Sequence, residues 1–184
     1  IAEAFDKAKR NKLYDPDFHS LPEPVGKSVL ENYHDPAVME IRDEAIVDLG
    51  WRGLKGAITE YNQKQFNKSI IIGGDITILK ERMAIASTKG MNDWDESTVL
   101  TANITSMIEM EKVKGTGWNT STHISCFSPE EAGRESAESA IRTRGGDRIS
   151  SGTYDVIFGK QPVTDLFANI VIPALSLSSI NTSD

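Results

Sequence analysis

Apolar and polar residues follow two different periods along the chain, and the change between them marks off the predicted elements. In residues 1–12, apolar side chains recur every three to four positions, which predicts a helix. Residues 13–35 show no period and contain three prolines, so they predict an irregular connector. A connector of this length must pack on something to stay ordered, and Phe18 and Leu21 are its expected anchors.

Two helices are expected next. Asp35 and Pro36 indicate a helix start, because an Asp side chain caps free backbone N–H groups and proline suits the first turn. A longer helix is predicted from Asp43 to Asn62 by the spacing of its apolar residues. Three glycines interleave with those residues: Gly50, Gly53 and Gly56. Each costs about 1 kcal/mol in an exposed helix, which favours close packing of this helix on a sheet.

The period becomes two from Lys68 onward, as is typical of β-strands. The expected strands are two runs within 69–79 around a Gly73-Gly74-Asp75 break, then 83–87, 96–111 and 115–125, with a turn at 89–93. The run 96–111 is long enough to form one strand of an antiparallel sheet with a bulge or bend.

A further helix is predicted from a capping box at Ser128–Glu131. In this motif the serine caps the helix, proline fills its first position and Glu131 reaches back to the cap. The helix should run to Arg142 and end at Gly145-Gly146. Helices that alternate with a meander of strands predict an α+β fold, with helices packed on one face of a mostly antiparallel sheet. Residues 1–184 are expected to form a single domain.

Composition narrows the possible partners. The hydrophobic share of 39% and the charged share of 26% are ordinary for a soluble globular protein. A net charge of −7 disfavours nonspecific nucleic-acid binding, and the basic clusters 7–12 and 142–144 fall at predicted helix C-terminal ends, where cations suit the helix dipole. No run reaches the roughly 20 apolar residues needed to cross a bilayer. We therefore expect neither a nucleic-acid nor a membrane partner.

The single cysteine, Cys126, rules out an intrachain disulfide and favours a reducing cytoplasm. It is expected to be a small buried hydrophobe near a strand end, the alternative being a reactive thiol at a helix N-terminus. The three histidines, His19, His34 and His123, have no metal-like spacing. Residues 92–97 alternate Asp and Asn but lack the glycine and distant Glu of a calcium loop, so a solvated hairpin turn is favoured.

Trp118 is the one candidate for peptide binding. It begins a run rich in Thr and Ser on a predicted strand. Such a surface can accept an extended peptide that pairs with the sheet edge. The alternative is a structural role for this tryptophan on a polar edge strand.

After the helix that ends at Gly145-Gly146, a strand and one more helix are predicted. Gly152–Phe158 is predicted as a strand, and apolar residues at helical spacing predict a helix after it: Val163, Leu166, Phe167, Ile170, Val171 and Leu175. Residues 166–176 contain no His, Glu, Asp or Cys, so this helix can pack but cannot hold a metal ion or move a proton. Pro173 crowds the carbonyl of Asn169, so the helix should kink there or end near Ile172.

This strand and helix resemble the corresponding segment of the TldD/PmbA family, the proteins long labelled modulators of DNA gyrase and now treated as zinc metallopeptidases and their relatives. Three other segments are similar to family motifs in the same order: 16–24 to "DPDFxGLPEP", 85–90 to "ANSxG" and 128–137 to the "E-x-x-A-x-x-A" helix. The resemblance covers residues 13–178, which is nearly all of the chain.

The resemblance also locates a missing metal site. In the TldD-like branch, the helix carries H-E-x-x-x-H, whose two His bind zinc and whose Glu can act as general base. Those positions fall here at Ala168, Asn169 and Pro173. The chain therefore resembles the PmbA-like branch, which keeps the fold and drops the zinc motif. The resemblance implies no catalytic residue, no metal ligand and no cofactor in this chain.

By resemblance, we expect a noncatalytic subunit of a cytoplasmic metalloprotease. It would help shape a peptide-binding cavity and pair with a zinc-bearing TldD-like subunit or form a homodimer. Family members of full length begin earlier and continue into a C-terminal domain, so the resemblance implies an N-terminal-half fragment. Two alternatives stay open: the protein is itself a zinc metallopeptidase with ligands in that C-terminal part, or it is a self-assembling structural domain. Whether it is an enzyme is therefore undecided at this point.

Overall fold

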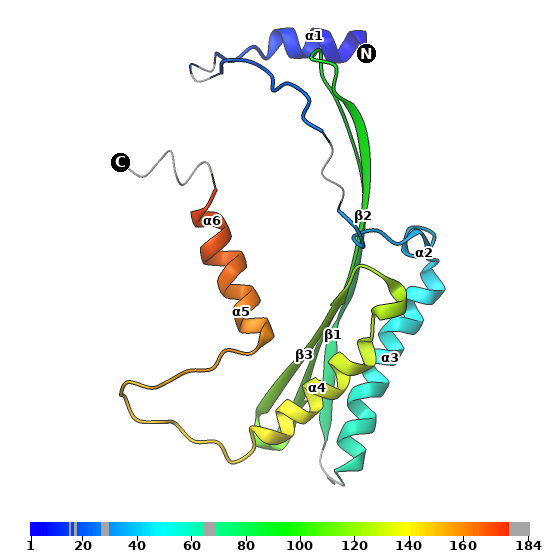
Figure 1. Cartoon of the computed structure of the whole chain (residues 1–184). Coiled ribbons are helices and arrows are strands. Elements are labelled where there is room, and N and C mark those ends of the chain that lie inside the picture. The colour runs from blue at the N-terminus through cyan, green and yellow to red at the C-terminus, as the bar shows by residue number, and fades with distance from the viewer. Residues whose placement is uncertain (15, 17, 27–29, 65–68, 177–184) are drawn as a thin grey trace.

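The computed structural model describes residues 1–14, 16, 18–26, 30–64 and 69–176 (Figure 1). The fold is α+β, as predicted: within these residues, three antiparallel strands form one sheet and two long helices cover one of its faces. No helix among them is long and apolar enough to cross a membrane. The elements follow in the order α1 (Ala2–Arg10), α2 (Pro36–Met39), α3 (Asp43–Gln63), β1 (Ile70–Ala86), β2 (Asn92–Ile108), a 3-10 turn η1 (Glu109–Glu111), β3 (Val113–Ser121), a second 3-10 turn η2 (Ile124–Cys126), α4 (Pro129–Arg142), α5 (Lys160–Leu166), a π-helical turn η3 (Phe167–Val171) and α6 (Ile172–Ala174).

The sheet has the strand order β1-β2-β3, and its strands differ in how far they pair. β1 pairs with β2 along its whole length, residues 70–86 against residues 92–108. β3 pairs only with residues 100–108 of β2. The other halves of the two long strands, residues 79–86 and 92–99, form a two-stranded ribbon that projects beyond β3, and we call this ribbon the arm (Figure 1).

β1 is one continuous strand, so the predicted break at Gly73-Gly74-Asp75 and the separate third strand were both wrong. All three residues keep their partners in the ladder with β2. At Gly74, an added Cβ would overlap the carbonyl oxygen of Asn103 across the ladder. The glycine therefore permits a close backbone approach within the strand and does not end it.

The hairpin turn lies slightly earlier than predicted. The Ser87 N–H donates to the Met91 carbonyl at 2.9 Å, and β2 begins at Asn92 rather than at Glu96. The acidic residues 92–97, which were expected in a solvated turn, are therefore strand residues paired with β1. Their charges lie along the arm rather than at its end.

The core lies between the sheet and the helix pair α3 and α4. Alternate residues of β2 face these helices and are buried, as expected for a sheet covered on one face: Leu100, Ala102, Ile104, Ser106 and Ile108. The two helices contribute small residues and a few large ones: Leu49, Ala57 and Tyr61 from α3, and Ala132, Ala137 and Ala140 from α4. The intervening β2 residues form the open face of the sheet.

Glycines allow α4 to pack closely against both of its neighbours. A Cβ at Gly133 would overlap the carbonyl oxygen of Gly53 in α3, and a Cβ at Gly56 would overlap that of Glu130 in α4. Gly117 of β3 stands equally close to the backbone of α4. The expected close packing therefore occurs at Gly53, which meets Ile104 of the sheet, and at Gly56, which packs on a helix rather than on the sheet, but not at Gly50, where an added Cβ would meet nothing.

α4 begins where the sequence predicted, but the capping box was wrong. The Ser128 side chain caps no backbone N–H, and Glu131 pairs with Arg134 at 2.6 Å instead of reaching back. The Ser128 N–H donates to Oδ1 of Asn119 on β3 at 3.0 Å. A bond between elements replaces the local one because α4 lies so close to β3.

Two other sequence expectations also differ from the structure. The segment 152–158, predicted as a strand, pairs with no described strand and forms an irregular, exposed connection. Strand propensity reflects packing against neighbouring strands, and this segment has none here. In the connector, Phe18 and Leu21 are exposed and were wrongly predicted to anchor it. Polar contacts hold the connector instead, among them Glu23 to Lys89 at 2.7 Å.

Replacing Gly133 with alanine should destabilise the fold by about 1–3 kcal/mol, because its Cβ would push α4 away from α3. Gly50→Ala is the matched control in α3, since a Cβ there meets nothing within 4 Å. Removing that helical glycine should stabilise the protein by about 0.5–1 kcal/mol. Urea denaturation of the two variants measures both free energies of unfolding, and effects of the same sign would contradict close packing of the helices.

Candidate functional site

The helix that carries the three family positions is built from α5, η3 and α6 in succession (Figure 1). Ala168 and Asn169 lie in the π-helical turn, and Pro173 lies in α6. Proline lacks an N–H and its ring crowds the carbonyl four residues earlier, so the wider π turn directly before it gives the ring room. The sequence predicted a kink or an end near Ile172. The distortion found is this turn, and the helix continues to Ala174.

The side chains at these positions do not fit a zinc ion. Zinc in proteins is bound by His nitrogen, Cys thiolate or carboxylate oxygen. Ala168 offers a methyl group and Pro173 an apolar ring, and Nδ2 of Asn169 donates to the Asp165 carbonyl of its own helix at 2.8 Å. In the part of the chain that the structure describes, no three His, Cys, Asp or Glu side chains gather into a group that could hold a metal. We therefore derive no catalytic step for this helix.

The same helix exposes its apolar side chains. Between 37% and 72% of the side chain is open to solvent at each of six positions: Val163, Leu166, Phe167, Ile170, Ile172 and Leu175. None of the residues in the helix is buried. Figure 1 places the helix on the opposite side of the sheet from α3 and α4. An apolar stripe at this spacing is what a helix uses to pack, and the described residues leave it without cover.

Trp118 lies on the open face of β3, opposite Asn103 in the ladder. It lines a cavity of about 190 Å³ with Thr116, with Glu135 of α4 and with residues 159–162, where α5 begins. The structure thus brings Trp118 next to the start of α5. The cavity does not include Ala168, Asn169 or Pro173.

The cavity carries one charge of each sign at its wall. Lys160 Nζ lies 3.8 Å from Oε2 of Glu135. β3 is an edge strand of the sheet, since only β2 pairs with it among the described residues. An unpaired strand edge beside an aromatic ring and a pair of opposite charges can hold an extended peptide by backbone hydrogen bonds. Sequence reasoning missed Glu135 and Lys160, because they come from separate helices and no local pattern links them to Trp118.

A second polar cluster, also missed, fixes the connector to the sheet. The Asp35 carboxylate accepts hydrogen bonds from the N–H groups of Ala37 and Ile124, each at 2.9 Å, and Asp35 is 8% exposed. The Asp35 N–H donates to Oγ1 of Thr98 on β2 at 2.9 Å. The bond from Ile124 is the main cause that lowers the pKa of Asp35. The sequence predicted the helix cap, but its second partner lies 89 residues away.

Two of the three histidines lie near this carboxylate. His34 and His123 both contribute to lowering the pKa of Asp35. Nε2 of His34 lies 3.2 Å from Oε2 of Glu96, and Nδ1 of His123 lies 2.9 Å from Oγ1 of Thr122. Nδ1 of His123 thus has a hydrogen-bond partner, whereas Nε2 of His34 is buried and forms no hydrogen bond among the described residues.

Cys126 is exposed, which corrects the expected buried position. It lies in the turn η2 and not inside a strand. β3 ends at Ser121, so the chain has left the sheet before it reaches the cysteine. Its exposure alone identifies no site.

Comparison with known proteins supports the fold and little more. No family model and no curated protein matches the sequence. A protein of Thermotoga maritima MSB8, provisionally named a modulator of a DNA gyrase, shares the fold at a TM-score of 0.64 and 14% identity over 82% of this chain. A protein of Bacteroides thetaiotaomicron VPI-5482 with a similar name gives a TM-score of 0.63 and 14% identity over 80% of this chain.

The chain spans 34% of the length of each of these two proteins. At 14% identity, the likeness establishes a common fold and leaves activity open. The chain has the fold seen in part of two proteins named as gyrase modulators.

Introducing two residues of the H-E-x-x-x-H motif should not create a zinc site. In the double variant Ala168→His and Asn169→Glu, the new side chains are adjacent and point in different directions, and Pro173 blocks the third position. We expect no tight zinc uptake by calorimetric titration. The triple variant that adds Pro173→His is the control for the role of proline. Stoichiometric zinc binding by the double variant would contradict the interpretation.

Asp35→Asn should lower the free energy of unfolding by about 1–3 kcal/mol at pH 7, because an amide nitrogen would face a backbone N–H that now donates to a carboxylate. The folded-state pKa lies below the unfolded value of about 3.9, so the charge stabilises the fold above pH 4 and ceases to do so as pH falls through the folded pKa. Denaturation at several pH values, with the exposed Asp155→Asn as control, should show the difference shrinking below about pH 4. A gap that stays constant would contradict it.

Proposed function

We propose that this chain is a noncatalytic, PmbA-like subunit of a TldD/PmbA-type cytoplasmic metalloprotease. It helps shape a peptide-binding cavity and pairs with a zinc-bearing TldD-like subunit, or with a copy of itself. The observation that carries the proposal is the side-chain set at Ala168, Asn169 and Pro173, where the zinc-binding branch has its ligands. The zinc that the protease requires is expected in the partner, and this chain holds no cofactor.

The fold is the first support. Two proteins named as gyrase modulators share it, and the ordered motifs of the sequence resemble the same group. The gyrase in their names is no reason to propose DNA binding here, because a net charge of −7 opposes contact with phosphates. The chain spans about a third of either protein, so the activity, substrates and partners of a whole protein remain within the proposal.

The Trp118 cavity is the second support. It lies where the sheet edge meets the start of α5, and its wall holds an aromatic ring with Glu135 and Lys160. Peptides present backbone groups, apolar side chains and charges, and this wall offers a partner for each. A noncatalytic subunit with such a cavity can orient a peptide toward a metal held elsewhere.

The exposed apolar stripe of the helix is the third support. Leu166, Phe167 and Ile170 are each at least 41% exposed, and Tyr154 and Phe158 before the helix are also at least half exposed. Apolar surface of this extent marks an interaction site. The same surface favours the second candidate, a self-assembling domain with no link to proteolysis.

The test is reconstitution with a TldD-like relative. We expect the mixed pair to hydrolyse an unfolded peptide faster than the zinc-bearing subunit alone. Trp118→Ala should raise the peptide concentration needed for half-maximal rate about tenfold, as loss of an anchoring aromatic does. Trp51→Ala is the matched control, since Trp51 is exposed on α3 at the opposite side of the sheet.

Three results would argue against the proposal. A pair no faster than the zinc-bearing subunit alone would exclude the accessory role. One zinc per copy of this chain with chelator-sensitive hydrolysis would make it a metallopeptidase in its own right. Self-association without any effect on the TldD-like relative would favour the structural domain.

A further inference from the structure

We propose that α1 of one copy of this chain binds the face of the arm that continues the open face of the sheet in a second copy. The exchange is reciprocal, so that each copy gives one helix and receives one. The inference concerns surfaces outside the Trp118 cavity, and it holds or fails independently of the proposed protease role.

The register of the arm separates its two faces. Residues directly opposite each other in an antiparallel ladder point to the same side. Four such pairs share the side that α3 and α4 leave open: Leu79 with Val99, Glu81 with Ser97, Met83 with Asp95, and Ile85 with Asp93. We call these eight residues the arm face.

The arm face combines apolar surface with negative charge. Leu79, Met83 and Ile85 are between 52% and 60% exposed. The charged residues of the arm face are three carboxylates, and no Lys or Arg belongs to it. The arm's own cations, Lys80 and Arg82, lie on the other side, where Lys80 donates to the Met39 carbonyl at 3.1 Å and Arg82 pairs with Glu96 at 2.6 Å.

The arm face is also hollowed. Met83, Ile85 and residues 93–95 line a cavity of about 320 Å³ together with Val25 and Tyr33 of the connector. The connector forms one wall, and Tyr33 donates to Oδ1 of Asp95 at 2.8 Å. A groove lined by both apolar and acidic side chains fits an amphipathic segment with positive charge.

α1 has the opposite character. Ile1, Ala4, Phe5 and Ala8 share one side of it, no residue of α1 is buried, and Phe5 is 61% exposed. Its last turn holds Lys7, Lys9 and Arg10, and Lys12 follows, whereas Glu3 and Asp6 lie nearer its start and Lys7 pairs with Glu3 at 2.9 Å. The C-terminal end of the helix is therefore basic, whereas the arm face is acidic, and both carry apolar side chains.

α1 has an apolar side that no other described residue covers. Helices of this kind gain most of their stability by packing an apolar side. In the single chain, that side is exposed to solvent.

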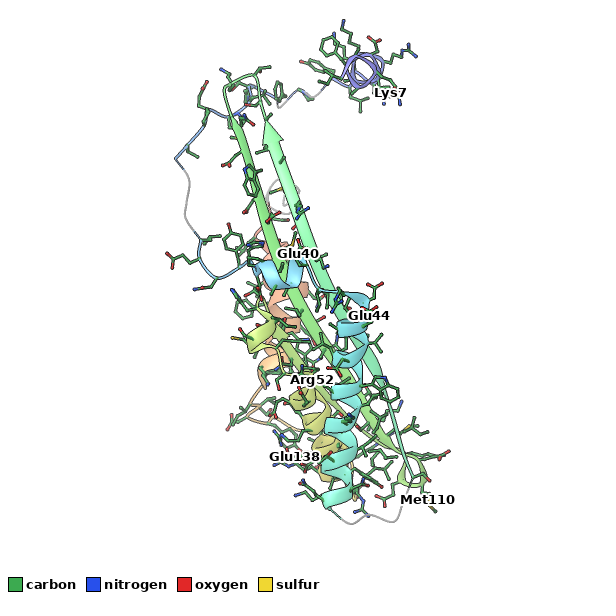
Figure 2. All side chains as sticks on the ribbon, turned by 90° about the vertical axis from the view of Figure 1, so that its right-hand side faces the viewer. Lys7, Glu40, Glu44, Arg52, Met110 and Glu138 are labelled. Carbon is green, nitrogen blue, oxygen red and sulfur yellow. The ribbon has the colours of Figure 1, made fainter. Side chains whose placement is uncertain are left out.

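The course of the connector favours a second copy over the chain's own arm. Glu23 pairs with Lys89 in the hairpin turn at 2.7 Å, so the connector is held at the tip of the arm. Figure 1 shows α1 beyond this tip, and Figure 2 shows Lys7 on α1 to one side of the ribbon. Since each chain has one α1 and one arm face, two copies related by a two-fold axis can satisfy both surfaces in a closed dimer.

Charge reversal tests this exchange. Variant A carries Lys7→Glu and Lys9→Glu, and variant B carries Glu81→Lys and Asp95→Lys. Each variant alone sets like charges against each other, so self-association measured by sedimentation velocity should weaken about tenfold or more relative to wild type. An equal mixture of A and B should form a heterodimer of near wild-type affinity, because both contacts are then between opposite charges.

Sedimentation velocity also measures the control variant and the outcomes that would contradict the inference. A variant with Lys55→Glu and Lys114→Glu, both exposed and distant from the arm, should self-associate like wild type. Circular dichroism identifies any variant that has lost its fold. The mixing experiment is carried out with variants that are folded by this criterion. Any of three results would overturn the inference. Wild-type protein stays monomeric at 100 times the protein concentration of a typical assay, variants A and B each self-associate as strongly as wild type, or the mixture of A and B does not pair.

Discussion

The close backbone contact of α4 with α3 and β3 is the constraint on which the rest of the structure depends. Gly53, Gly56 and Gly133 bring the two helices together, and Gly117 brings β3 up to α4. Because no side chain separates these backbones, the position of α4 is fixed on two sides at once. Two neighbouring features depend on that position: the Ser128 N–H donates to Asn119 of β3, and the wall of the Trp118 cavity includes Glu135 of α4.

Sequence reasoning correctly predicted the elements that follow from hydrophobic periodicity. It failed where contacts between residues far apart in the chain determine the structure. The helical spacing of α3 and α4 and the alternation of β2 gave the α+β fold, because one buried face imposes its period on the chain. From the sequence alone, Gly73-Gly74 predicts a break in the strand. In the structure both glycines stay paired with β2, and Gly74 permits a close backbone approach instead. Gly152–Phe158 has every local mark of a strand, and its failure to form one shows that pairing outweighs propensity.

The candidate site was predictable only in its parts. Trp118 and the helix with Ala168 and Asn169 were both recognised from the sequence, yet nothing local shows that the tryptophan lies beside the start of that helix. Glu135 and Lys160 join it through the packing of α4 and the course of the chain before α5. Asp35 is similar: its role as a cap follows from the next residue, but its bond to Ile124 depends on how β3 ends.

The two sides of the sheet differ in how fully their surfaces are used. On the side of α3 and α4, small residues bring backbones together and the core is filled. The other side carries the arm face, Trp118 and the apolar stripe of α5 to α6, whose large side chains are exposed (Figure 1). The described residues leave Phe167 and Ile170 of this helix uncovered, and exposed apolar surface of this kind is typical of an interaction site. The proposed contacts of this protein therefore all fall on the open side of the sheet, because the other side has already used its apolar residues to form the core.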